Sequence, residues 1–149
     1  MAVAMDPAGA AFGLWQGERT TGLGVANEAG ALTWNEQFSR DFSGSQAFYQ
    51  AVFGYGYQDM SGDGFTYATL MVDGHEVGGI GEYPDGTPAE MPAAWAAYFA
   101  VTDTDAAVAK VTELGGRVVG APRDTPFGRI AVVTDHEGAV FSLITPPAR

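Results

Sequence analysis

The chain has 149 residues, no cysteine and a formal net charge of -11 at pH 7, with 7 lysines and arginines against 18 aspartates and glutamates. This charge excludes nucleic acid and anionic membrane surfaces as partners, because binding phosphate needs a basic face. The missing cysteines exclude disulfides and thiolate chemistry. Residues 1–6 lack the basic segment and apolar core of a signal peptide, and no apolar run approaches the roughly 20 residues of a membrane span, so we expect a cytoplasmic protein.

One phrase occurs twice, at residues 6–14 and again at 135–143. Both copies fit D-x-x-G-A-x-F-x-L, in which Asp and Gly form a turn that leads into an alternating strand. A sequence pattern that recurs along the chain indicates a duplicated structural unit. We therefore expect residues 1–16, with a strand at about 8–16, to resemble the end of a preceding domain in a tandem protein. Residues 17–31 are rich in Gly, Thr, Asn and Glu and are expected to be a linker.

The next segment predicts a strand, a helix and three further strands. In residues 32–39 the residues Leu32, Trp34, Glu36 and Phe38 share one face, which places Glu36 in a bulky inward group. Asp41 and Ser43 are cap candidates for a helix that runs to Phe53 and is closed by Gly54. The strands are predicted at about 55–58, 65–72 and 76–82, with Asp73-Gly74 as the turn between the last two.

The same order then begins again. A strand at 95–101 is followed by a helix that Asp103 caps and that Gly115-Gly116 ends, and by strands near 117–120, 128–134 and 139–145. The two βαβββ modules, residues 32–82 and 95–146, together predict one domain over 32–149. The fold class is α+β, with the tandem modules forming a curled mixed sheet around a cavity.

This order of elements resembles the vicinal-oxygen-chelate superfamily, which includes glyoxalases, bleomycin-resistance proteins and extradiol dioxygenases. The resemblance is carried by several stretches along the chain. They are 34–36 with Asp41, the helix ending Phe48-Tyr49-Gln50-Ala51-Val52-Phe53-Gly54, Trp95-Ala96-Ala97-Tyr98-Phe99, Glu113-Leu114-Gly115-Gly116, Asp124-Thr125-Pro126-Phe127-Gly128-Arg129 and the two copies of the repeated phrase. Within this superfamily, the chain resembles the C-terminal domain of a tandem actinobacterial glyoxalase-like protein.

The resemblance also says where a divalent metal would be held. Enzymes of the superfamily place His, Glu or Gln on the first and last strands of each module. Here the first-strand positions hold Trp34 and Ala96, and the last-strand positions hold Ser142 and the region Gly79-Ile80-Gly81. These are poor ligands for a divalent cation. We therefore expect no metal and no other cofactor, with a hard, oxygen-liking ion held by Glu36 and Glu82 as the alternative.

Glu36 is the strongest single candidate for chemistry, because a carboxylate on an apolar strand face is costly without a partner. It is read either as a hydrogen-bonded structural group or as a ligand-binding group and general base. His75 and His136 are expected to be exposed turn residues. Arg129 has two readings, an anchor for an anionic group and a surface salt bridge. The predicted ligand-binding set is Trp34, Glu36, Phe38, Tyr98, Phe127 and Arg129.

The expected function is metal-free binding of a small, partly aromatic molecule in the cavity between the modules. The alternatives are a lyase, isomerase or oxygenase of the same superfamily that uses Glu36 or a non-standard metal site, and a scaffold whose cavity is vestigial. An unpaired apolar strand at residues 6–16 should add to a sheet edge. We therefore expect a homodimer, in which that segment is open to exchange between the subunits, and a change in oligomeric state or solubility when residues 1–16 are deleted.

Overall fold

The computed structural model describes residues 1–19 and 22–147. The chain divides into two compact units, Met1–Gly22 with Asn35–Trp95, and Leu23–Trp34 with Ala96–Arg149. From residue 32 onward the helices and strands follow one another in the order that the sequence predicts, and the fold class is α+β. Among the described residues, neither helix combines the length and apolar character that a membrane crossing requires.

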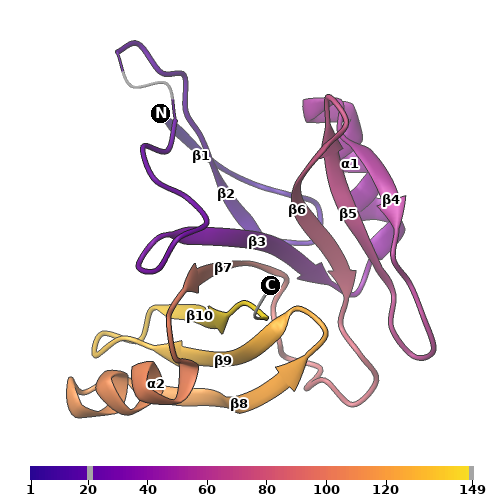
Figure 1. The fold of residues 1–149 in the computed structure, drawn as a ribbon. Helices are drawn as coiled ribbons and strands as arrows, with labels where there is room; N and C mark the ends of the chain where they lie inside the picture. The colour runs from indigo at the N-terminus through magenta and orange to yellow at the C-terminus, as the bar shows by residue number, and fades with distance from the viewer. Residues whose placement is uncertain (20–21, 148–149) are drawn as a thin grey trace. The chain divides into compact units, whose positions relative to one another are not determined.

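The first unit contains a βαβββ module whose four strands belong to a mixed sheet (Figure 1). Its elements are residues 35–39 of β3 (Leu32–Ser39), α1 (Phe42–Phe53), β4 (Gly56–Asp59), β5 (Tyr67–Val72) and β6 (His75–Glu82). The strand order is β4-β5-β6-β3, and β6 runs parallel to β3 and antiparallel to β5. The β5–β6 turn places Asp73 at φ 50 and Gly74 at φ 80, the left-handed conformations that a tight hairpin turn requires.

The second unit repeats this arrangement. Its elements are residues 96–100 of β7 (Ala94–Ala100), α2 (Thr104–Glu113), β8 (Arg117–Thr125), β9 (Gly128–Thr134) and β10 (Val140–Thr145), with strand order β7-β10-β9-β8. Helix α2 packs on β8, β9 and β10. The two predicted βαβββ modules are therefore present, and strand β8 is longer than the predicted 117–120.

The helix ends confirm the predicted caps. The Asp41 carboxylate accepts a hydrogen bond of 2.9 Å from the Gly44 backbone, and the Asp103 carboxylate accepts one of 3.0 Å from the Ala106 backbone. Gly54 closes α1 in the left-handed conformation, with φ 71. In α2 the C-cap is Leu114 and the left-handed residue is Gly115, with φ 88, which agrees with the prediction that Gly115-Gly116 ends this helix.

The N-terminal segment differs from the prediction of a single strand at about 8–16. It forms a hairpin of β1 (Ala2–Met5) and β2 (Ala11–Leu14), a two-stranded antiparallel sheet of its own. Strand β1 was not predicted from the sequence, because an alternating pattern cannot be recognised in a segment as short as Ala2–Met5. The linker prediction for 17–31 also needs refinement, since Gly30 and Ala31 exchange backbone hydrogen bonds with Ala100.

Both copies of the repeated phrase form the same turn. The Asp6 carboxylate accepts a hydrogen bond of 2.8 Å from the Ala10 backbone, and the Asp135 carboxylate accepts one of 2.9 Å from the Ala139 backbone. The turn glycines, Gly9 at φ 96 and Gly138 at φ 97, have the same left-handed conformation. The phrase is thus a carboxylate-capped turn that leads into a strand, as predicted.

The two copies differ in what the aspartate contacts. Asp6 is 5% exposed, and its second oxygen accepts hydrogen bonds from the Tyr49 hydroxyl at 2.8 Å and from Gln37 Nε2 at 3.2 Å. Gln37 also donates to Ser45 on α1 at 3.2 Å. Asp6 therefore ties the hairpin to both α1 and β3.

Replacing each aspartate by alanine measures this difference. Asp6→Ala and Asp135→Ala both remove a turn cap, but only the first strips the acceptor from the buried Tyr49 and Gln37 side chains. We expect Asp6→Ala to lower the free energy of unfolding by about 1–3 kcal/mol more than Asp135→Ala, the cost of buried donors left without a partner. Chemical denaturation measures both variants, and equal losses would show that the buried contacts of Asp6 add nothing to stability.

Candidate functional site

The two faces of strand β3 carry different kinds of side chain. Because side chains alternate along a strand, Glu36 and Phe38 lie on one face, while Asn35, Gln37 and Ser39 lie on the other. The second face packs under α1, where Gln37 and Ser39 are both 0% exposed. Glu36 and Phe38 therefore share one face, as the alternation predicts, and the opposite face is buried as well. Both faces of β3 are covered, and its most buried residues are polar ones that bond to α1 and Asp6.

Glu36 and Tyr67 form the polar centre of the first face. Glu36 is 8% exposed, and its carboxylate accepts a hydrogen bond of 2.8 Å from the Tyr67 hydroxyl. Tyr67 lies on β5, two strands from β3, and reaches Glu36 across β6. A buried carboxylate needs such a donor, because an unsatisfied one is expensive. A hydrogen-bonded carboxylate is one of the two readings of Glu36, and the structure adds Tyr67 as its partner.

Two glycines of β6 make room for this arrangement. Gly79 pairs with Glu36 and Gly81 pairs with Phe38 across the parallel β3–β6 ladder. A Cβ atom at Gly79 would overlap the Tyr67 hydroxyl, and one at Gly81 would overlap the Phe38 ring. The Gly78-Gly79-x-Gly81 cluster is therefore explained by side chains that lie flat over the strand, a use that periodicity alone does not reveal.

Aromatic rings extend the same face on both sides of Glu36. Phe65 stacks on Tyr67 with ring centroids 5.3 Å apart, and Phe38 stacks on Tyr83 with centroids 5.7 Å apart. The Arg40 guanidinium lies 5.8 Å from the centroid of the Tyr83 ring, in cation–π range. This face, defined by Glu36, Phe38, Tyr67 and Tyr83, is called the Glu36 face below.

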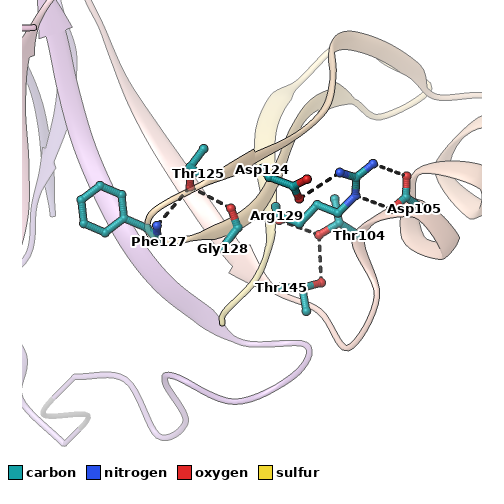
Figure 2. Close-up of polar contacts among 8 residues, drawn as sticks. All are labelled: Thr104, Asp105, Asp124, Thr125, Phe127, Gly128, Arg129 and Thr145. Atoms are coloured by element: carbon teal, nitrogen blue, oxygen red, sulfur yellow. Dashed lines mark hydrogen bonds and ion pairs between the residues drawn. The ribbon is translucent and has the colours of Figure 1, made fainter. Parts of the chain in front are cut away.

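Arg129 of the second unit has ion-pair partners, which supports its reading as a surface salt bridge (Figure 2). Its guanidinium pairs with Asp105 of α2 and, at 3.0 Å, with Asp124 of β8. These contacts raise the pKa of Arg129 further and lower the pKa of Asp105. Phe127 lies in the β8–β9 turn beside Thr125 and is 60% exposed. Neither observation tests a ligand-binding role for Arg129 or Phe127.

The remaining predicted residues lie on the first strand of each module. Trp34 is half-buried on β3, and Tyr98 is half-buried on β7, paired in register with Ser142 of β10. Glu36 and Phe38 belong to the first unit, whereas Trp34, Tyr98, Phe127 and Arg129 belong to the second. The structure therefore brings Glu36 and Phe38 together on one face, and the ligand-binding roles of all six residues stay predictions.

The positions that hold metal in the superfamily carry other side chains here. Ser142 is 2% exposed and Ile80 is 0% exposed in the core under α1, where it packs with Tyr49 and Leu70. Within residues 1–19 and 22–147, no three His, Cys, Asp or Glu side chains gather in a way that could hold a metal ion. His75 and His136 are exposed, as predicted.

Residues 31–143 match the family described as Glyoxalase/Bleomycin resistance protein/Dioxygenase superfamily, and the chain belongs to this family. Solved structures agree on the fold. Methylmalonyl-CoA epimerase from Mycobacterium tuberculosis superposes with a TM-score of 0.58 at 19% identity, covering 78% of this chain and 88% of that one. A variant of the Streptomyces coelicolor epimerase, in complex with 2-nitronate-propionyl-CoA, gives 0.57 at 23% identity, covering 78% and 97%.

Two curated relatives are more similar in sequence. A Mycobacterium tuberculosis protein named "Putative glyoxylase CFP32" is 43% identical over 148 residues, which cover 98% of this chain and 56% of that protein. A Streptomyces protein named "Anthracycline biosynthesis protein DauV" is 37% identical over 144 residues, covering 97% and 52%. The chain thus spans about half the length of these relatives.

The Glu36 face can be tested through its glycines. Gly79→Ala must displace the Tyr67 hydroxyl from Glu36, so we expect it to lower the free energy of unfolding by about 1–3 kcal/mol, as overpacking does. Gly24→Ala is the matched control, since a Cβ atom at Gly24 meets no atom within 4 Å. Thermal and chemical denaturation compare the two variants. A Gly79→Ala protein as stable as Gly24→Ala would contradict the described packing of Tyr67.

Proposed function

We propose that the protein binds a small, partly aromatic molecule that carries a hydrogen-bond donor, and that the Glu36 face contributes to this binding. The single observation that carries the proposal is the buried Glu36 carboxylate, held at 2.8 Å by Tyr67 within a surface otherwise made of aromatic rings. Rings of this kind favour a flat apolar body, and a carboxylate fixes the orientation of a donor group.

Two further facts support this ligand class. The chain belongs to a superfamily that includes bleomycin-resistance proteins, which is consistent with binding a small molecule without catalysing a reaction. The names of the relatives, glyoxylase and anthracycline biosynthesis protein, both point to small organic molecules. The net charge of -11 favours a neutral or cationic ligand over an anionic one.

Phenol and anisole form a matched pair of probes for the Glu36 face. Both present the same ring, but only phenol can donate a hydrogen bond to the carboxylate. We expect phenol to shift the backbone amide NMR signals of β3, β5 and β6. The dissociation constant for anisole, measured from the same signals, should be about tenfold higher, which corresponds to about 1.4 kcal/mol for one charge-assisted hydrogen bond. Glu36→Gln should abolish the preference for phenol. An unchanged preference in that variant would refute the role of Glu36.

The second part of the proposal is that no divalent metal is resident. It is supported by Trp34, Ala96 and Ser142 at superfamily ligand positions and by the space above Gly79 and Gly81, which Tyr67 and Phe38 fill. We expect protein purified without chelator or added metal to contain far less than one equivalent of divalent metal by elemental analysis. A stoichiometric metal would overturn this part and favour the enzymatic alternative.

The enzymatic alternative has one observation in its favour. Glu36 is a buried carboxylate beside a tyrosine hydroxyl, an arrangement that can accept and return a proton. A lyase, isomerase or oxygenase activity would therefore be centred on Glu36. The expected homodimer and cytoplasmic location likewise stay predictions.

A further inference from the structure

The first unit also contains a pocket on the opposite side of its sheet, under α1. Its volume is about 360 Å³, within the range of about 300–1,000 Å³ typical of small-molecule sites. Strand β2 forms one wall, and the other walls come from α1, β3, Tyr55 and Trp95. The lining residues are Phe12, Gly13, Leu14, Trp15, Asn35, Tyr49, Phe53, Tyr55 and Trp95. Asn35 lies two residues before Gln37 on β3, so its side chain is on the same face as Gln37 and on the opposite face from Glu36.

The rings around this pocket hold one another in fixed orientations. Trp95 stands edge-on to Tyr49 with centroids 5.3 Å apart, and Phe12 stands edge-on to Tyr49 at 5.7 Å and to Phe53 at 5.9 Å. Tyr55 stacks on Phe53 at 5.3 Å. Such a preformed set of ring faces and edges lowers the ordering cost of binding a flat ring.

The polar groups of the pocket are uncharged. The Tyr49 hydroxyl accepts a hydrogen bond of 2.8 Å from Trp95 Nε1 and donates one of 2.8 Å to Asp6. Burial raises the pKa of Tyr49 and the pKa of Tyr55, so both remain neutral phenols at physiological pH. The lining residues include no Lys, Arg, His, Asp or Glu. This lining matches an aromatic body without a negative charge.

We propose that this pocket is a second binding site, separate from the Glu36 face, for a flat, fused-ring aromatic molecule without a negative charge. Trp15 is 60% exposed at the rim and supplies a ring that can close on the bound molecule. The pocket is complete only when the hairpin is docked, because Phe12, Gly13, Leu14 and Trp15 belong to the hairpin or directly follow it. Asp6, which fixes the hairpin, is therefore a positioning residue for this site.

Three bicyclic probes test the chemistry of the site. 2-Naphthol is flat and neutral, decahydro-2-naphthol has the same carbon skeleton and hydroxyl without the aromatic faces, and 2-naphthoate adds a negative charge. We expect titration calorimetry to show 2-naphthol binding about tenfold more tightly than either analogue. Backbone NMR shifts should fall on β2 and the C-terminal end of α1. Shifts confined to β3, β5 and β6, or equal binding of the saturated analogue, would overturn the proposal.

Two substitutions of equally exposed apolar residues provide the matched control. Trp15→Ala should weaken 2-naphthol binding about tenfold, whereas Val119→Ala, which shortens a side chain that is also 60% exposed, should leave it unchanged. An equal loss of affinity in both variants would show that 2-naphthol binds outside this pocket, and would refute the site. A change of oligomeric state in Trp15→Ala by light scattering would also refute it, because the pocket would then be covered by a second copy. Phenol binding at the Glu36 face is measured independently, so each proposal can fail without the other.

Discussion

The first unit depends on one buried carboxylate. Asp6 lies in the core rather than at the surface, and its oxygens accept hydrogen bonds from the Ala10 backbone, Gln37 and Tyr49. Burying an ionised carboxylate costs several kcal/mol unless such donors are in place, so the hairpin, α1 and β3 must come together at once. The Tyr49 hydroxyl also accepts a hydrogen bond from Trp95 Nε1, which extends the same constraint to the Trp95 side chain. The core of Tyr49, Leu70 and Ile80 forms around this point.

Local signals explain why the order of elements was predictable. A capping aspartate, a left-handed glycine and an Asp-Gly turn act within a few residues, so Asp41, Asp103 and Asp73-Gly74 could be identified without knowledge of the fold. The end of α2 has the same local origin. Two adjacent glycines, Gly115 and Gly116, offer two places for the left-handed residue, and the sequence does not distinguish them.

Long-range contacts were not predictable from the same signals. Asp6 and Asp135 occupy identical positions in identical turns, yet only Asp6 has Gln37 and Tyr49 against it. What differs is the surface on which the turn docks, and no local pattern records that surface. Tyr67 escaped recognition as the partner of Glu36 for a similar reason. The two residues come together through the pairing of β3, β6 and β5, which includes a register shift between Leu70 and Met71.

The glycines of β6 connect the architecture of the Glu36 face to its chemistry. A metal ligand on this strand would have to project from position 79 or 81 to reach that face, because Ile80 points into the core under α1. Any side chain at those positions would occupy the space of the Tyr67 hydroxyl or the Phe38 ring. An aromatic surface over β6 and a metal ligand on β6 therefore exclude each other sterically. Because the chain has glycine at both positions, the Tyr67 hydroxyl and the Phe38 ring cover β6 in the region where the resemblance to the superfamily places a metal ligand.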